Sequence, residues 1–200
     1  MSQLEQILKE ETLMKEAFSS HEALTSLTYE HCGSTILRVA SYMIDALENG
    51  RKVIFMGNGG SAADAQHLAA ELVGRFTRER QGLAAIALTT DTSILTAIAN
   101  DYGYDQIFSR QVEALAQNGD VVVGISTSGN SPNILKAMEV ASERGCILVG
   151  FAGNKGGKLY ENTDLCITVP SLVTARIQEM HILIGHVLCD IVEEYFSRKD

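Results

Sequence analysis

The feature that most constrains the fold is a set of five short apolar runs that begin at residue 53. The runs are rich in valine and isoleucine, and their apolar residues are continuous rather than alternating with polar ones. Such runs are typical of strands that are buried on both faces, as in a parallel sheet. The sequence therefore predicts five parallel strands, at Val53–Met56, Ala84–Leu88, Val121–Ile125, Ile147–Phe151 and Cys166–Val169.

Segments with helical character lie between these strands and after the last one. They cover residues 61–76, 92–99, 105–117, 131–145 and 174–197. Parallel strands that alternate with helices are connected by right-handed crossovers. The alternation therefore predicts an α/β fold, a three-layer sandwich in which helices cover both faces of a five-stranded parallel sheet.

The chain before the first strand is also helical in pattern. Residues 3–18 and 22–49 are interpreted as two helices, the second of which ends at Asn49-Gly50, a usual helix stop. A length of 200 residues fits one domain with a modest extension. We expect residues 1–50 to form a helical arm that belongs to the same domain and to an oligomer interface. Residues 51–200 would form the α/β domain.

Charge and cysteine pattern limit the possible environment. A net charge of −9 argues against broad contact with nucleic acid. The N-terminal segment is amphipathic and acidic, unlike a signal peptide, and no stretch approaches the roughly 20 apolar residues of a membrane span. The four cysteines form no CxxC pair and are interpreted as reduced core residues. We therefore expect a cytoplasmic protein without nucleic-acid or membrane partners.

The first and third expected strands each end in a small polar turn that runs into a helix. The turns are residues 57–61, Gly-Asn-Gly-Gly-Ser, and residues 126–131, Ser-Thr-Ser-Gly-Asn-Ser. Ligands of parallel sheets bind outside the carboxyl ends of the strands, and helix N-termini favour anions. Either turn alone is more simply explained by ordinary turn and capping residues. Two such turns together indicate a phosphate site, whereas the absent P-loop and the incomplete GxGxxG pattern disfavour a nucleotide-dependent enzyme.

The helix after the first turn carries a possible metal-binding pair. His67 and Glu71 are four residues apart and share a helix face. An imidazole and a carboxylate at that spacing can both reach one Zn²⁺ at about 2.0–2.2 Å. The alternative is a surface hydrogen bond. Periodicity in the last helix favours Glu179 with His186 as further partners, but leaves open a wider set, Gln178, Glu179, His181 and His186.

Four stretches together resemble the phosphoheptose isomerases of the sugar-isomerase (SIS) domain superfamily. They are residues 57–76, 95–112, 119–137 and 176–186, and the likeness spans about residues 30–195. The resemblance implies a homotetramer with shared active sites that converts sedoheptulose 7-phosphate to D-glycero-D-manno-heptose 7-phosphate. This aldose–ketose isomerisation through an enediol would be the first step of nucleotide-activated heptose biosynthesis. Whether the heptose would serve lipopolysaccharide, another surface glycan or a small-molecule product stays open.

The resemblance also implies which residues form the site. One Zn²⁺ per subunit would be held by His67, Glu71, Gln178 and His186. The resemblance thus selects Gln178 instead of Glu179, the residue that periodicity favours. Glu71 would be the catalytic base and His186 the acid. Substrate would be bound by Asn58, Gly59, Gly60, Ser61, Glu71, Asn100, Asp101, Ser126, Thr127, Ser128, Ser131 and Gln178. Some family members carry an aspartate where this chain has Ala175, so the resemblance implies that one substrate contact would be missing or replaced here.

Two considerations refine these expectations. The alternative is a non-catalytic SIS protein that binds a replication-initiation partner or senses a sugar phosphate. The SIS protein that binds a replication-initiation partner lacks the carboxylate corresponding to Glu71. The presence of Glu71 in this chain therefore favours the enzyme over the non-catalytic alternative. The spacing of Gln178 and His186 sets a further expectation. The two residues are about 12 Å apart along a straight helix, so one metal ion could bind both side chains only with strain. We therefore expect that Gln178 precedes the regular helix, that the helix is bent, or that the two side chains come from different subunits.

Overall fold

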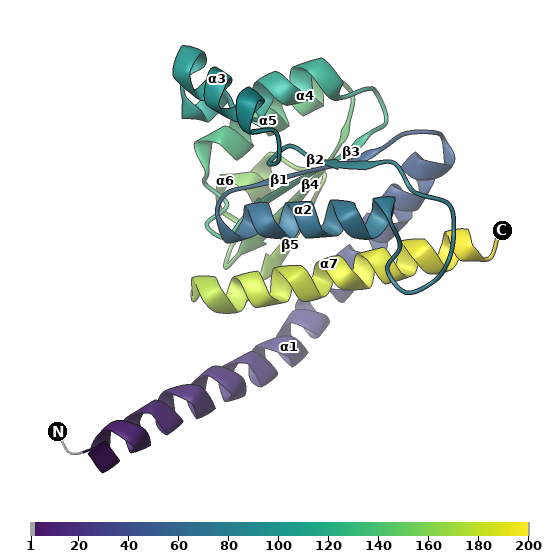
Figure 1. The fold of residues 1–200 in the computed structure, drawn as a ribbon. Coiled ribbons are helices and arrows are strands. Elements are labelled where there is room, and N and C mark those ends of the chain that lie inside the picture. The colour runs from purple at the N-terminus through teal and green to yellow at the C-terminus, as the bar shows by residue number, and fades with distance from the viewer. Residues whose placement is uncertain (1–2, 200) are drawn as a thin grey trace.

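The computed structural model describes residues 3–199, and within them the chain forms a five-stranded sheet. The strands are parallel and lie in the order β2-β1-β3-β4-β5 (Figure 1). Their bounds are Val53–Gly57 for β1, Ala85–Ala87 for β2, Val121–Ser126 for β3, Ile147–Gly153 for β4 and Leu165–Val169 for β5. All five predicted strands are confirmed, because each expected run falls within two residues of the observed bounds.

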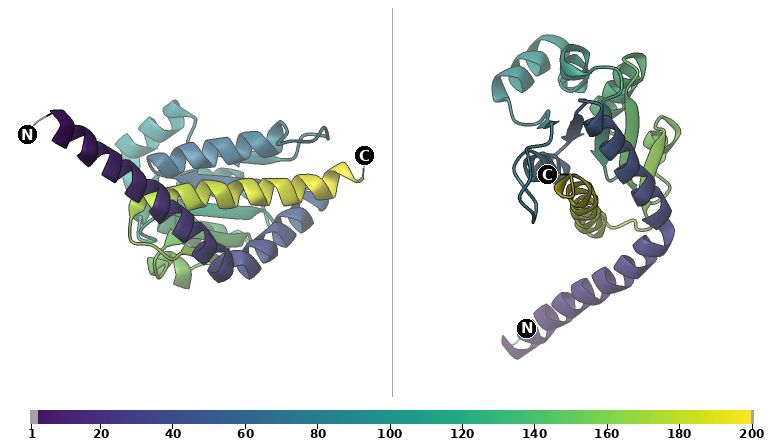
Figure 2. Two further views of the ribbon diagram at one scale, coloured as in Figure 1. Left: turned by 90° about the horizontal axis from the view of Figure 1, so that it is seen from below. Right: turned by 90° about the vertical axis from the view of Figure 1, so that its right-hand side faces the viewer.

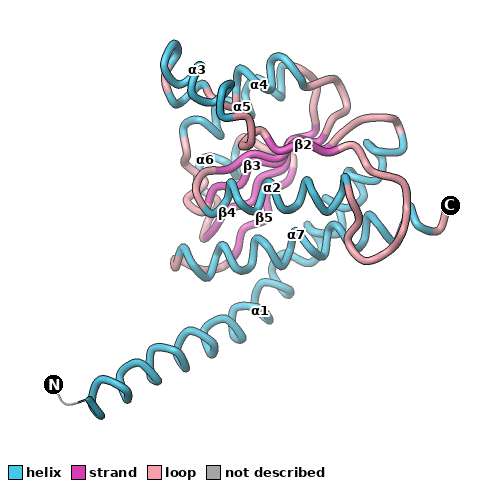
Figure 3. The backbone as a smooth tube through the Cα atoms, in the orientation of Figure 1, coloured by secondary structure: helices cyan, strands magenta, loops and turns pink. Residues whose placement is uncertain are grey.

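Helices cover both faces of the sheet (Figures 1 and 3). On one face lie α1 (Gln3–Glu48), α2 (Gly60–Val73) and α7 (Thr174–Ser197). On the other face lie α4 (Ser109–Leu115), α5 (Pro132–Glu143) and α6 (Gly157–Glu161), with α3 (Thr92–Tyr102) and the short helix η1 (Tyr104–Gln106) at its margin. Phe55 and Val123 belong to the first of the two cores, and Ile54 and Met138 to the second. The predicted three-layer α/β sandwich is therefore confirmed.

The N-terminal segment is one long helix, so the predicted break near residue 20 is wrong. Neither glycine nor proline interrupts residues 18–22, and the Ser20 hydroxyl is satisfied within the helix by donating to the Ala17 carbonyl (3.0 Å). The second half of α1 packs on the sheet with Val39 and Met43 buried. The first half extends away from the domain, and Phe18 is 75% exposed there (Figures 1 and 2).

Other helix boundaries differ from the expectation for local reasons. α2 ends at Val73, three residues early, because the backbone N–H groups of residues 76–78 bind the Glu193 carboxylate instead of continuing the helix. The predicted helix at 105–117 is divided into η1 and α4. The short α6 was not predicted, since five residues are too few for a periodic pattern. None of the described helices combines the length and hydropathy needed to cross a membrane.

The sheet has a switch point between β1 and β3, which are neighbours with Gly57 opposite Ile125. From β1 the chain continues through α2 to β2 on one side, and from β3 it continues through α5 to β4 on the other. α2 and α5 lie on opposite faces of the sheet. Ligands of open α/β sheets bind in the crevice that forms at such a point. Both polar turns start there.

Candidate active site

The turn between β1 and α2 favours glycine at two positions, for close approach at one and for backbone conformation at the other. A Cβ on Gly57 would lie 2.4 Å from the Ser61 carbonyl oxygen, and Gly59 has a φ of 55°, which favours glycine. Ser61 is buried in the first turn of α2. The glycines thus bring the backbone and the free N–H groups of the helix start to the edge of the sheet, where an anion can bind.

The Asn58 side chain in this turn is fixed by two residues that sequence reasoning missed. Asn58 and Asn133 exchange amide hydrogen bonds of 2.9 and 2.8 Å, and the Tyr104 hydroxyl donates to the Asn58 Oδ1 (3.1 Å). Asn133 is buried at the start of α5, and Tyr104 begins η1. Neither residue carries a sequence signal, because both contacts join segments that are far apart in the chain.

The turn between β3 and α5 gathers hydroxyl groups. The Ser126 Oγ lies 2.8 Å from the Ser131 Oγ and 3.4 Å from the Ser128 Oγ. Gly129 has a φ of 65°, and a Cβ there would lie 1.8 Å from the Gly156 carbonyl oxygen. Thr127 and Ser128 also line a hollow of about 320 Å³. Because β1 and β3 are neighbouring strands, these hydroxyls lie at the same edge of the sheet as the turn after β1.

Three side chains of the predicted metal set converge behind these turns. The Nε2 atoms of His67 and His186 are 2.8 Å apart, and the Glu71 Oε1 lies 3.3 Å from the His67 Nε2. One ligand atom from each of the three residues lies within 4.8 Å of the others. His67 and Glu71 come from α2, and His186 comes from α7. Two imidazoles and one carboxylate with an open position are a donor set that suits catalytic zinc, so the residues fit a divalent metal.

Comparison with known proteins places the chain in a family. The SIS domain family model matches residues 18–153. The phosphoheptose isomerase of Geobacter sulfurreducens is 59% identical over 176 residues, which cover 88% of this chain and 93% of that protein. The enzyme of the same name from Geotalea daltonii is 58% identical over 181 residues, 90% and 94% of the two chains. The chain belongs to the phosphoheptose isomerase family of SIS-domain proteins.

Solved structures agree with this placement. Phosphoheptose isomerase GmhA from Neisseria gonorrhoeae has a TM-score of 0.88 at 44% identity, and the match covers 92% of this chain and 98% of that chain. The phosphoheptose isomerase from Francisella tularensis has a TM-score of 0.88 at 39% identity, with 97% and 100% covered. The family resemblance predicted from the motifs is therefore confirmed.

In this member of the phosphoheptose isomerase family, Gln178 contacts the start of α2, whereas the three converging side chains come from positions further along α2 and α7. A Cβ on Gly60 would be 2.6 Å from the Gln178 Nε2, so Gln178 packs against the first turn of α2. His67 is seven residues further along α2, about 10 Å at 1.5 Å per residue. Gln178 and His186 both lie within α7, which runs without a visible bend in Figures 1 and 2. The expectations that Gln178 precedes this helix or that the helix is bent are therefore wrong.

The partner favoured by periodicity points elsewhere. Glu179 forms ion pairs with Arg176 and with the His21 Nδ1, at 2.8 Å for the latter, and therefore faces α1. Asn100 and Asp101 are exposed at the end of α3, where the Asn100 amide donates to Asp101 (2.8 Å). No contact between this pair and the three converging side chains is observed within the described residues.

Asp64 is a further carboxyl on the same side of α2. It precedes His67 by three residues, and burial raises its pKa to about 6, although nearby His67 lowers it. Its Oδ2 is buried and has no hydrogen-bond partner among the described residues. Asp64 can therefore be partly protonated near neutral pH at the edge of the candidate site.

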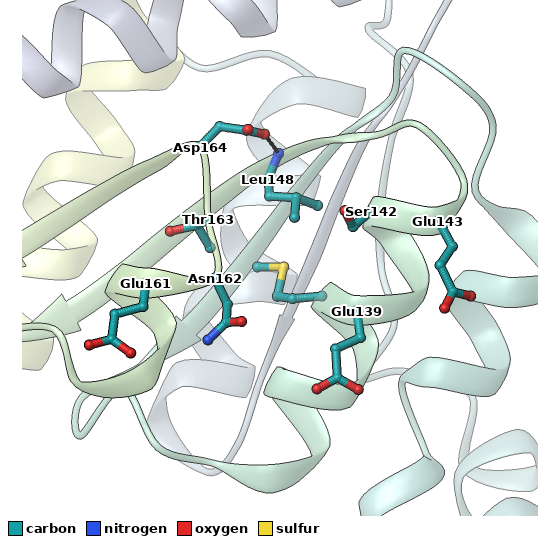
Figure 4. Close-up of a pocket in the computed structure, with 9 residues that line it drawn as sticks. Glu139, Ser142, Glu143, Leu148, Glu161, Asn162, Thr163 and Asp164 are labelled. Carbon is teal, nitrogen blue, oxygen red and sulfur yellow. Dashed lines mark hydrogen bonds between the residues drawn. The ribbon is translucent and has the colours of Figure 1, made fainter.

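A hollow of about 490 Å³ is lined by residues of α5, of α6 and the segment after it, and of the start of β4 (Figure 4). Carboxylates of Glu139, Glu143, Glu161 and Asp164 line it, and Asp164 accepts the N–H of Leu148 (2.8 Å). Asp164 directly precedes β5 and Leu148 lies at the start of β4, so this hollow is at the amino ends of the strands. A wall of carboxylates repels phosphate, and the hollow does not serve as the sugar-phosphate site.

Proposed function

We propose that this protein is an aldose–ketose isomerase that converts sedoheptulose 7-phosphate to D-glycero-D-manno-heptose 7-phosphate. The observation that carries the proposal is the convergence of His67, Glu71 and His186 along α2, the helix that begins at the first of the two polar turns at the switch point of the sheet. Membership of the phosphoheptose isomerase family names the reaction. The proposed place of action is the cytoplasm, which agrees with free cysteines throughout the described part of the chain.

The two turns divide the substrate between them in this proposal. The hydroxyl turn, Ser126, Thr127, Ser128 and Ser131, holds the phosphate with neutral donors next to the start of α5. Asn58, Gly59, Gly60 and Ser61 hold the sugar chain at the start of α2. Asn100 and Asp101 contribute from α3. The hydroxyl groups already approach one another within hydrogen-bonding distance, so the turn is preorganised for an anion.

The proposed metal is one Zn²⁺ per subunit, held by His67, Glu71 and His186. When bound, the metal supplies Lewis-acid polarisation of the sugar carbonyl. Each residue offers one ligand atom to the cluster. Glu71 therefore keeps its second carboxylate oxygen, and His186 keeps its Nδ1, for proton transfer.

We assign the proton transfers to these two residues. Glu71 removes a proton from C1 of the ketose while His186 protonates the oxygen on C2, which gives an enediol. His186 then takes the proton from the oxygen on C1, and Glu71 returns its proton to C2. The product is the aldose, and both residues are restored. General acid–base catalysis of this kind contributes about 10²–10⁴-fold to the rate.

We further propose that the active enzyme is a homotetramer in which Gln178 reaches the metal of a neighbouring subunit. Within one chain Gln178 packs at Gly60, two turns away from His67. α1 and α7 expose apolar side chains along a groove of about 610 Å³, and Leu37 on its rim is 63% exposed. Contiguous apolar surface of this kind marks interaction sites. Residues 1–50 would then be the assembly arm, and residues 51–200 the SIS domain.

The experiment that tests the proposed function is Glu71→Gln, which keeps the shape of the side chain but removes its basicity. We expect kcat with sedoheptulose 7-phosphate to fall by about 10²–10⁴-fold. The matched control is Glu113→Gln, because Glu113 is an exposed carboxylate on α4 whose observed partner is Arg110. If Glu71→Gln retains the metal and turns over substrate at nearly the wild-type rate, Glu71 is not the catalytic base. A wild-type protein without isomerase activity would favour a sugar-phosphate sensor instead.

A further inference from the structure

A buried carboxylate on α7 organises the loop that follows α2. Glu193 is fully buried and lies seven residues after His186. It accepts the backbone N–H groups of Phe76 (2.7 Å), Thr77 (2.7 Å) and Arg78 (2.8 Å), and the Thr77 hydroxyl (3.1 Å). Burial alone would raise the pKa of this carboxyl, but these donors lower it below its usual range. Glu193 is therefore an anion at neutral pH, and three successive N–H groups wrap around it.

A buried arginine connects the same loop to the end of α2. The Arg80 side chain is 1% exposed, and its Nη2 lies 3.5 Å from the Glu193 Oε1. Its guanidinium also donates to the carbonyls of Gly74 (2.9 Å), Gln81 (2.9 Å) and Glu71 (2.8 Å). One side chain thus holds both ends of the loop and the backbone of a residue in the candidate metal set. Figures 1 and 3 show this loop passing beside α7 before the chain returns to β2.

The loop places an aromatic ring on the candidate site. The Phe76 ring stacks on the His186 imidazole, with centroids 5.4 Å apart and planes inclined by 29°. The N–H of the same residue is bound by Glu193, so the position of the ring depends on the buried carboxylate. The His186 ring therefore contacts both the Phe76 ring and the His67 ring, whose centroid is 5.0 Å away.

The buried network of Glu193 and Arg80 is explained better by the positioning of site residues than by a contribution to folding stability alone. Burying charged groups is costly, and ion pairs in protein interiors often contribute little net stability. What the network does achieve is a fixed position for His186 and for the Glu71 carbonyl. Groups that orient a metal-binding side chain typically change metal affinity or activity by 10–100-fold when they are altered.

We propose that Phe76, Glu193 and Arg80 form a positioning network that fixes the His186 ring and the last turn of α2 for metal binding and proton transfer. The inference rests on the proposed function, because it assigns these residues to the proposed site. Phe76 acts by stacking, and Glu193 and Arg80 act by holding the loop that carries it. All three are positioning residues, since none contributes an atom to the cluster of His67, Glu71 and His186.

The test uses the full-length protein and the pair Phe76→Leu and Phe76→Tyr. Leucine keeps the apolar bulk but removes the flat ring, whereas tyrosine keeps the stacking. We expect Phe76→Leu to lower Zn²⁺ affinity, measured by competition with a chromophoric chelator, by about 10–100-fold. We expect kcat of Phe76→Leu to fall by a similar factor with little change in KM. Phe76→Tyr should keep the Zn²⁺ affinity and the kcat of the wild type. Glu193→Gln should behave like Phe76→Leu. Glu113→Gln serves as its control, because Glu113 is an exposed carboxylate on α4 whose observed partner is Arg110.

A metal-free measurement separates this inference from the proposed function. The ¹³Cε1–¹H signal of His186, assigned with His186→Gln, reports the ring before Zn²⁺ is added. We expect Phe76→Leu to shift this signal, because the stacked aromatic ring is lost. An unchanged signal, or unchanged Zn²⁺ affinity and kcat, would overturn the positioning network. Unchanged Zn²⁺ affinity in His67→Ala would instead overturn the proposed metal site, and the inference with it.

Discussion

Acid should destabilise this protein through one buried histidine. His181 on α7 is fully buried, and its Nε2 donates to the Ala152 carbonyl (3.1 Å). Its Nδ1 is buried and has no hydrogen-bond partner within residues 3–199. Burial lowers the pKa of this imidazole to about 4, although the Ala152 carbonyl raises it somewhat. Protonation would therefore place an N–H group and a charge where nothing accepts them.

The size and the sign of the effect follow from linkage. The pKa of an unfolded histidine is about 6.5, so between pH 6.5 and 4 the unfolded chain binds a proton that the folded chain does not. The stabilisation is present above pH 6.5 and is lost as the pH falls, at about 1.4 kcal/mol per pH unit. Between pH 7 and pH 4.5 the free energy of unfolding should therefore decrease by about 2 kcal/mol from His181 alone.

The assay compares wild type with His181→Gln by urea unfolding at pH 7 and at pH 4.5, at a fixed protomer concentration. A glutamine amide can still donate to the Ala152 carbonyl but does not titrate. Other titrating groups are common to both proteins, so they cancel in the difference between the two free energies of unfolding. We expect that difference to move in favour of the variant by about 2 kcal/mol on acidification. A difference that is the same at both pH values would refute the assignment of the proton to His181.

Two further substitutions test the turns. Gly129→Ala should lower the free energy of unfolding by about 3 kcal/mol or more and raise KM, because residue 129 has a left-handed backbone conformation and a Cβ there would overlap the Gly156 carbonyl oxygen. The control is Gly50→Ala, which has a similar φ but open space around it. It should lower the free energy measured by thermal unfolding by only about 1–2 kcal/mol. Asn133→Leu should raise KM for the sugar phosphate and lower the free energy of unfolding by about 1–3 kcal/mol, because the Asn58 amide loses its partner. An unchanged KM would show that Asn133 does not position Asn58 for the substrate.

The fold could be predicted from the sequence because its strands are buried on both faces. The β3 run, Val121–Ser126, is fully buried, so its composition marks it without any knowledge of its neighbours. Helix ends were less predictable. The end of α2 depends on Glu193, which lies more than 100 residues later in the chain. The continuity of α1 across Ser19 and Ser20 was missed because serine is compatible with both a helix and a break.

The candidate site could be predicted only where its residues are local in sequence. His67 and Glu71 share a helix face by spacing, and the two turns are contiguous segments. Periodicity in the last helix favoured His186 together with Glu179, and the family resemblance selected Gln178 in place of Glu179. Tyr104 and Phe76 carry no local signal, because each contacts the site through a different element or loop.

The position of His186 also depends on the close approach of α2 and α7. α2 and α7 run side by side in the same direction, since Gly60 meets Gln178 near their starts and the loop after α2 meets Glu193 near the end of α7. A Cβ on Gly185 would lie 2.4 Å from the Leu68 Cδ2, so a larger side chain there would push the helices apart. Gly185 and Leu68 are the chain neighbours of His186 and His67. The small residue next to His186 therefore permits the 2.8 Å approach of the two imidazoles, and the three side chains converge because the backbones beneath them are in contact.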